Sequence, residues 1–302
     1  MDSKSAVYIP PSSFSRIFNL FRAEVSRDEK VYWVLRIAVA LCFFGHGAFG
    51  FITDNGSLGK VGWLAFYKSF GLEPELVYKF MLMPLVGALD IMIAIAILFL
   101  PMRSIWVWAL FWCVFTAFLR PLSGQGIAEF FERGGNYGPP LALVFYSGLH
   151  FRSFKDWFSL MAPPKLTQKN VGQLIFILRL AIAFLLIGHG SFYIFNENNQ
   201  RDYLLEHWAA VGVDLTVPGM LVIGWLEFAL GVLVFFKPLR NILIFIIVWK
   251  VSTEALYFIS GVPNGYIWEW IERSGNYWAP AALIMLLQWK EAHSGKECSP
   301  FP

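Results

Sequence analysis

The sequence predicts an all-α integral membrane protein of eight transmembrane helices, arranged as two tandem four-helix repeats with the same orientation. The first observation behind this prediction is the composition. The 302 residues are 57% hydrophobic, 18% aromatic and only 15% charged, and the mean hydropathy of +0.55 is too high for an ordinary soluble domain. The second observation is that one set of motifs occurs twice along the chain, in the same order.

The duplication is clearest around two histidines. Residues 36–49 read RIAVALCFFGHGAF and residues 179–192 read RLAIAFLLIGHGSF, so His46 and His189 each lie between two glycines in an apolar run. Of the twelve positions in 129–140 and 269–280, which hold ERGGNY and ERSGNY, seven are identical. Further motifs keep the order, namely 85–90 with 222–227 and 101–103 with 238–240. An internal duplication explains all four pairs.

Eight hydrophobic runs provide the expected spans. They lie at about 33–52, 78–100, 104–122, 138–151, 172–195, 218–236, 239–259 and 278–290. The fourth and eighth are short against the ~20 residues that a helix needs to cross the hydrocarbon. We expect them to begin in the ERGGNY and ERSGNY loops or to cross with little tilt.

These spans divide the chain into five parts. We expect an N-terminal interfacial segment (1–32), a first repeat (33–152), a cytoplasmic linker (153–171), a second repeat (172–290) and a C-terminal tail (291–302). Apolar residues at helical spacing favour an amphipathic helix in the first segment, and a frayed tail is the alternative; they are Phe14, Ile17, Phe18, Phe21 and Val25.

Charge in the connections predicts the orientation. Lysine and arginine gather in the N-terminal segment, the linker, the C-terminal tail and the turns at 101–104 and 237–240, whereas the other connections are acidic. By the positive-inside rule both termini are cytoplasmic, in what we expect to be a bacterial inner membrane. Because each repeat has an even number of spans, both copies share one orientation.

The polar residues within the spans are expected to meet at one depth. At about 1.5 Å per helical residue, the four motifs of each repeat converge on a layer in the outer half of the membrane. Insertion of an ionisable side chain at the bilayer centre costs about 2.5–3.5 kcal/mol, so such a side chain is expected to face a polar partner or a water-filled cavity. The sequence predicts an outward-opening polar pocket in each repeat, formed by His46, Asp90, Thr116, Glu132, Arg133, Asn136 and Tyr137, and by His189, Glu227, Thr253, Glu254, Glu272, Arg273, Asn276 and Tyr277.

Structural roles are the alternative for the same residues. Buried histidines and acids can join helices by hydrogen bonds alone, and the Glu-Arg pairs can cap the last helix of each repeat. Lys250 and Glu254, four residues apart, are expected to pair, while Arg133 and Arg273 are expected to reach down from the outer loops. Arg36 and Arg179, near the inner ends of their helices, are interpreted as snorkelling anchors.

The glycines beside the histidines allow either close helix packing or the approach of a flat ligand. One such ligand is haem b, with His46 and His189 as its axial ligands. Cys42 and Cys113 lie in hydrophobic runs and, with Cys298, are interpreted as packing residues and not as a disulfide framework. The sequence contains no HExxH, CxxC or GxSxG motif and no phosphate-binding loop, and its scattered basic residues exclude a nucleic-acid partner.

The repeat unit resembles the DoxX-like family of small membrane proteins. The resemblance rests on an arginine near the start of the first span, a glycine-flanked polar residue near its end and an acid in the second span, and it covers residues 33–150 and 172–290. It implies a four-helix bundle per repeat. It also implies membrane redox or quinone-linked chemistry, or the handling of a lipophilic ligand.

Three functions follow as hypotheses. The first is that the pockets bind or transport a small or lipophilic molecule such as a quinone, with the histidines relaying protons and the Glu-Arg loops gating the mouth. The second is a haem b electron-transfer subunit. The third is a structural subunit of a larger membrane complex, docked through exposed tryptophans; these are Trp106, Trp108, Trp112, Trp268 and Trp270. The residues do not decide whether the protein is an enzyme.

Overall fold

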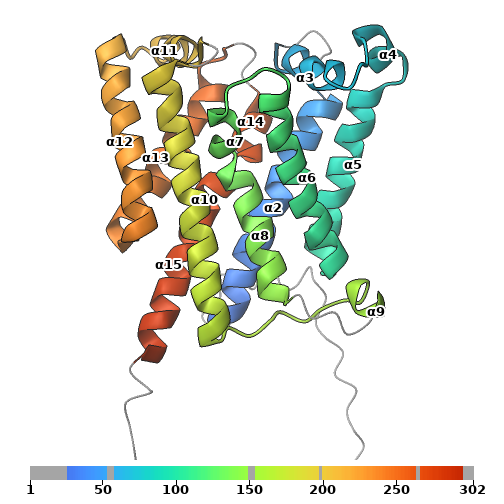
Figure 1. Ribbon diagram of the computed structural model, residues 1–302, viewed down its shortest axis with the longest axis vertical. Coiled ribbons are helices and arrows are strands. Elements are labelled where there is room, and N and C mark those ends of the chain that lie inside the picture. Colours follow the sequence, from blue (N-terminus) through green and yellow to red (C-terminus); the bar gives the residue numbers. More distant parts are fainter. Residues whose placement is uncertain (1–25, 53–57, 149–153, 197–198, 263–265, 295–302) are drawn as a thin grey trace, which may run out of the picture.

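The computed structural model describes residues 26–52, 58–148, 154–196, 199–262 and 266–294, and the regular elements within them are all helices (Figure 1). Six are long and apolar enough to span a membrane, which indicates an integral membrane protein. They are α2 (Arg27–Ile52), α5 (Leu82–Phe99), α6 (Arg103–Leu122), α10 (Gln168–Phe195), α12 (Val217–Phe236) and α13 (Arg240–Ile259). The proposed interfacial residues from Phe14 to Val25, and Cys298, lie outside the described residues.

The other helices lie at the two ends and in the interior of the bundle. At the upper end in Figure 1 are α3 (Leu58–Lys68), α4 (Pro74–Lys79) and α11 (Gln200–Ala210), and at the lower end is α9 (Phe154–Trp157). The remaining elements are α7 (Ala128–Glu132), α8 (Gly134–Ser147), α14 (Ile267–Glu272) and α15 (Gly275–Ser294). The start of α2 and the end of α15 lie at the same end of the molecule, as the prediction of two termini on one side requires.

The expectation that the helices of the two short hydrophobic runs begin in the motif loops is confirmed. Helix α8 begins inside the ERGGNY motif at Gly134 and α15 begins inside ERSGNY at Gly275. Each follows a one-turn helix that ends beside the arginine of the motif, α7 before Arg133 and α14 before Arg273. The fourth and eighth hydrophobic runs are therefore the lower parts of two broken helices.

The duplication is visible in the order and register of the elements. Helices α2, α3, α5, α6, α7 and α8 correspond to α10, α11, α12, α13, α14 and α15. Helices α6 and α13 both have 20 residues and begin 137 residues apart, at Arg103 and Arg240. The hydroxyl of Thr116 donates to the Trp112 carbonyl at 2.8 Å, and that of Thr253 donates to the Trp249 carbonyl at 2.9 Å. Residues 137 positions apart in α6 and α13 are therefore structural equivalents.

The two repeats are interlocked. Each first helix packs extensively against the second helix of its own repeat, α2 with α5 and α10 with α12. The broken helices cross over, so that α7 and α8 pack on α10 while α14 and α15 pack on α2. Within their most apolar windows α2 and α10 are 72% and 61% buried, against 28–39% for the other long helices. The core is thus built around α2 and α10, and it is not two separate four-helix bundles.

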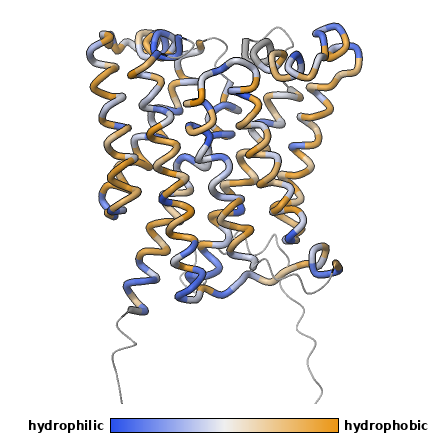
Figure 2. Tube along the Cα trace, in the orientation of Figure 1, coloured by the Kyte–Doolittle hydropathy of each residue, from blue (hydrophilic) through white to orange (hydrophobic). Residues whose placement is uncertain are grey.

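The outer helices expose apolar faces. Figure 2 shows hydrophobic positions along the long helices, and hydrophilic ones at the ends and in the interior where α7 and α14 lie. Of the tryptophans predicted to form a docking surface, Trp108 is exposed, but Trp106 is completely buried. Trp268 packs against Phe44, and Trp270 donates to the Val251 carbonyl. Those five tryptophans therefore do not form one surface.

Arg36 is a helix cap and not a snorkelling anchor. Its side chain is buried and donates to the Ile97 carbonyl at 3.0 and 2.9 Å and to the Leu98 carbonyl at 2.6 Å, at the C-terminus of α5. Arg179 makes the corresponding bond to Val234, at 3.3 Å, at the end of α12. The last carbonyls of a helix have no partner of their own, and the apolar surroundings make them costly to leave unpaired.

Replacing Arg36 by leucine is expected to lower the free energy of unfolding by about 1.5–3 kcal/mol, since hydrogen bonds from a charged donor are lost and carbonyls stay buried. Arg179→Leu is the matched control. It removes a longer hydrogen bond and is expected to lower the free energy of unfolding by less. Unfolding of both variants in mixed detergent measures the difference, and equal losses would contradict the assignment of Arg36 as the stronger cap.

Candidate functional site

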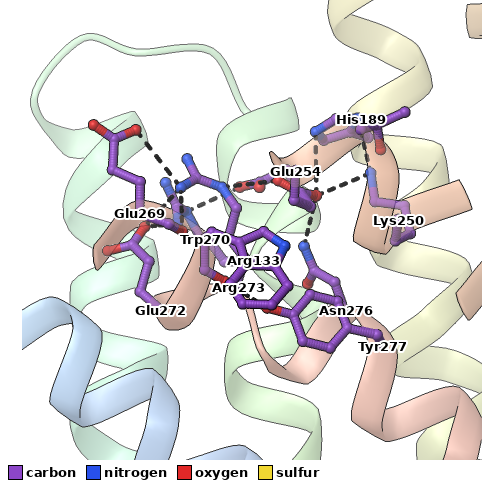
Figure 3. A network of polar contacts seen from close by, with 12 residues as sticks. Arg133, His189, Lys250, Glu254, Glu269, Trp270, Glu272, Arg273, Asn276 and Tyr277 are labelled. Atoms are coloured by element: carbon purple, nitrogen blue, oxygen red, sulfur yellow. Dashed lines mark hydrogen bonds and ion pairs between the residues drawn. The ribbon is translucent and has the colours of Figure 1, made fainter. Parts of the chain in front are cut away.

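A buried ionic cluster joins α10, α12 and α13 in the second repeat, and Figure 3 shows its His189, Lys250 and Glu254 side chains. The Nδ1 atom of His189 lies 3.1 Å from Glu227 Oε2, and Lys250 Nζ lies 3.1 Å from the same nitrogen. Lys250 Nζ is also 3.1 Å from Glu254 Oε1 and 3.6 Å from Glu227 Oε1. The expected pair of Lys250 and Glu254 is confirmed. All four side chains are at most 2% exposed.

The acids of this cluster have further donors. The indole of Trp249 donates to Glu227 Oε1 at 2.6 Å, and the amide of Asn276 donates to Glu254 Oε1 at 2.9 Å. Arg273 Nε lies 3.1 Å from Glu254 Oε2, so this arginine does reach down from its loop as predicted. Burial of two carboxylates is tolerable because each oxygen meets a cation or a donor.

Two arginines connect this cluster to the first repeat. Arg273 Nη1 and Arg133 Nη1 lie 3.3 and 3.1 Å from the same oxygen, Oε1 of Glu272. Arg133 Nε lies 2.9 Å from Glu132 Oε2, within its own motif. The ERGGNY and ERSGNY motifs therefore form one network across the two repeats, and Arg133 pairs with the acids of these motifs and not with Asp90.

The glycines allow this crossing. A Cβ atom on Gly45 would collide with the backbone nitrogen of Glu272, and one on Gly188 would collide with that of Glu132. A Cβ atom on Gly275 would likewise collide with the carbonyl of Gly135. The following glycines of the two GHG motifs, Gly47 and Gly190, face Gly87 and Gly224 of the second helices. Both glycines beside each histidine thus serve close helix packing.

The corresponding cluster of the first repeat is looser. His46 Nδ1 lies 3.6 Å from Asp90 Oδ2, and its Nε2 lies 3.9 Å from Glu272 Oε2. The ring of Trp63, from α3, stacks on the imidazole with 4.7 Å between centroids and 24° between planes. The side chain of His46 is 21% exposed, against 2% for His189. This histidine therefore has room beside it.

That room is a cavity of about 220 Å³. Five of the predicted ligand-binding residues line it, which are His46, Asp90, Thr116, Arg133 and Asn136. Its walls are largely aromatic, with Trp63, Phe66, Tyr67, Phe70, Trp112 and Phe115. Burial, together with the charge of Asp90, raises the pKa of Tyr67 to about 12, so its hydroxyl remains a donor at neutral pH. The cavity combines a flat apolar wall with a polar base.

A second cavity, of about 520 Å³, adjoins the first at the end of the molecule that carries α3 and α11. Trp63, Phe66, Arg120 and Arg133 line both cavities. The larger one belongs to both repeats, because its charged lining comes from each of them: Arg120, Glu129, Glu132, Arg133, Asp202, Glu206, Glu269, Glu272 and Arg273. A polar space is thus present at this end of the molecule, and it is shared between the repeats.

Glu272 and Arg273 line the larger cavity, but the other predicted site residues of the second repeat pack within the protein. His189, Glu227 and Glu254 surround Lys250 and do not line either of these two cavities. Thr253 bonds to its own helix, and the hydroxyl of Tyr277 donates to the Trp270 carbonyl at 2.5 Å. Tyr137 stacks on Phe130 with 5.4 Å between ring centroids. The two repeats have diverged in what their equivalent residues do.

Three contributors were not among the predicted site residues. Arg120, 3.1 Å from Glu129, and Lys250 could have been included in the site, because a basic residue inside an apolar run is itself a signal. Trp63 carries no such signal. Its position over His46 depends on how α3 folds back onto the end of the bundle.

Haem ligation does not fit this arrangement. Both ring nitrogens of His46 face carboxylates, of Asp90 and Glu272, and both of His189 face Glu227 and Glu254. An axial histidine needs one nitrogen directed at the iron.

No family model, no curated protein and no solved structure matches the chain. The geometry alone must therefore support a function.

Proposed function

We propose that the chain is a polytopic DoxX-like inner-membrane protein that binds a small lipophilic ligand in the 220 Å³ cavity of the first repeat, as a binding site or as the entry site of a transport pathway. The observation that carries this proposal is the cavity itself, with Asp90 and His46 at its polar base beside an aromatic wall. Ligand sites commonly combine an apolar lining with a few convergent polar groups.

The proposed architecture has eight membrane segments in two parallel repeats, with both termini in the cytoplasm. The broken helices α7–α8 and α14–α15 are the fourth and eighth segments. Irregular backbone at membrane depth is tolerated where it is buried in protein or lines a cavity, and the turns at Arg133 and Arg273 meet that condition. The larger, charged cavity is the outer mouth, and its Glu-Arg loops control entry to the aromatic cavity.

The ligand would enter from the mouth and pass the four residues that line both cavities. Arg133 lies at that boundary and is held there by Glu132 and Glu272. A quinone headgroup suits the aromatic wall and accepts hydrogen bonds, and so quinones belong in the first set of test compounds. The ion pairs of the ERGGNY and ERSGNY motifs hold both loops in place, which preorganises the site.

Thermal unfolding of the purified protein with a panel of decylubiquinone, a neutral lipid and 2-phenylethylammonium tests the proposal. At least one compound is expected to stabilise the protein saturably, by about 2.7 kcal/mol at about 100 times its Kd. Asp90→Asn and Trp63→Ala are expected to reduce that stabilisation, because they remove the polar base and the stacked wall of the cavity.

Trp225→Ala is the control, because this tryptophan is 57% exposed on the outer face of α12. It is expected to keep the full ligand-induced shift. If no compound stabilises the protein, or if the shift survives unchanged in both cavity variants, then the cavity is not the binding site.

A further inference from the structure

The two repeats place different residues at two equivalent positions. In the shared register of α6 and α13, Cys113 corresponds to Lys250 and Ala117 corresponds to Glu254. The surroundings are otherwise kept: His46, Asp90, Trp112, Thr116 and Asn136 correspond to His189, Glu227, Trp249, Thr253 and Asn276. The second repeat therefore shows the same type of site with a lysine side chain inside it.

Lys250 behaves as an internal ligand of that site. Its ammonium group is completely buried and is held by His189 Nδ1 and by the carboxylates of Glu227 and Glu254. An ammonium group has three donors, and here it has three neighbours at 3.1–3.6 Å. The arrangement of histidine, acid and tryptophan is thus able to hold a fully desolvated amine.

In the first repeat the equivalent space is open. Cys113 and Ala117 are short, and both line the 220 Å³ cavity together with His46 and Asp90. Asp90 is only 3% exposed, and the neighbouring base that it pairs with is His46 at 3.6 Å. The carboxylate is desolvated beside a cavity that has the place for an ammonium group but lacks the lysine.

The charge balance around the two cavities also favours a cation. The charged side chains that line them include seven carboxylates but three arginines, Arg120, Arg133 and Arg273. The carboxylates are those of Asp90, Glu129, Glu132, Asp202, Glu206, Glu269 and Glu272. An excess of carboxylates is compensated when a cation enters.

We propose that the first-repeat cavity binds an organic ammonium ion, whose –NH₃⁺ group occupies between Asp90 and His46 the place that Lys250 Nζ occupies in the second repeat. The apolar part of this ligand packs on the wall of Trp63, Phe66 and Trp112, where aromatic faces also attract the cation. This inference rests on the proposed function and names the chemical class of its ligand.

Two compounds of the same shape test the charge directly. Full-length protein in nanodiscs is titrated with 2-phenylethylammonium and with 2-phenylethanol, and binding is followed by calorimetry and by thermal unfolding. The ammonium compound is expected to bind at least about tenfold more tightly, and Asp90→Asn is expected to remove most of that preference, because it weakens binding of the ammonium compound far more than binding of the alcohol.

A second variant does not depend on Asp90. Cys113→Lys combined with Ala117→Glu reproduces the second repeat and supplies a tethered amine. It is expected to abolish binding of the ammonium compound without loss of thermal stability. Trp225→Ala, outside the cavity, is expected to bind as the unaltered protein does.

The outcomes separate this inference from the function on which it rests. Equal affinity for the alcohol and the ammonium compound, with no effect of Asp90→Asn, overturns the ammonium ligand and leaves a neutral-ligand site. Binding of decylubiquinone without binding of the ammonium compound also overturns the ammonium ligand and leaves a neutral-ligand site. If none of these compounds binds, both the inference and the proposed function are wrong.

Discussion

Replacement of Lys250 by methionine is expected to lower the free energy of unfolding by about 3–5 kcal/mol. Methionine keeps the length and apolar character of the side chain but removes the ammonium group. Glu227 and Glu254 would then be completely buried with one neighbouring cation fewer, which costs more than the loss of a surface ion pair. Unfolding in mixed detergent, or the yield of monodisperse protein, measures the loss.

A double variant provides the control for this experiment. Lys250→Cys together with Glu254→Ala installs the residues that the first repeat has at Cys113 and Ala117, so that one negative charge leaves with the positive one. Most of the lost stability is expected to return, because the remaining acid, Glu227, keeps His189 at 3.1 Å and the Trp249 indole at 2.6 Å. A double variant no more stable than Lys250→Met would show that the charge balance is not the cause.

Gly188→Ala is expected to be the most damaging of the small changes on α10. A methyl group there meets the backbone of Glu132 and Phe131 in α7, which cannot turn aside as a flexible side chain does. Overpacking of this kind costs about 1–3 kcal/mol. Since the side chain of Glu132 is ion-paired with Arg133, displacement of α7 also shifts this arginine, which lines both cavities. Lower thermal stability and weaker ligand binding should therefore appear together.

The same helix offers the matched substitution Gly172→Ala. Nothing lies within 4 Å of a Cβ atom added to Gly172, and alanine favours a helix over glycine by about 1 kcal/mol. This variant should be as stable as the original protein or slightly more stable. Equal destabilisation by both substitutions would indicate that helix α10, and not its contact with α7, is sensitive to change.

The network of the two arginine motifs explains why these predictions are coupled. Arg273 forms ion pairs with Glu254 and with Glu272, and Glu272 also pairs with Arg133 of the first repeat. A change at Lys250 therefore acts on groups that reach the cavity of the first repeat. In such networks the effects of paired substitutions are not additive, and double-mutant cycles between Lys250 and Arg133 measure the coupling.

Much of the fold follows from the sequence alone. Long apolar runs become helices because a backbone in hydrocarbon must satisfy its own hydrogen bonds, and their lengths follow from the thickness of the bilayer. The duplicated motifs predict the duplicated order of elements. The rise per residue also predicts that His189, Glu227 and Glu254 meet at one depth, and the contacts among them agree with it.

Tertiary structure decided which neighbours meet at that depth. Position along a helix axis gives depth, but rotation about the axis and the choice of neighbour depend on packing. The sequence therefore did not reveal that α7 and α14 cross to the other repeat, or that Arg36 caps α5. It also did not reveal that one equivalent site is filled by Lys250 while the other is open beside Asp90, because that difference depends on the space left between packed helices.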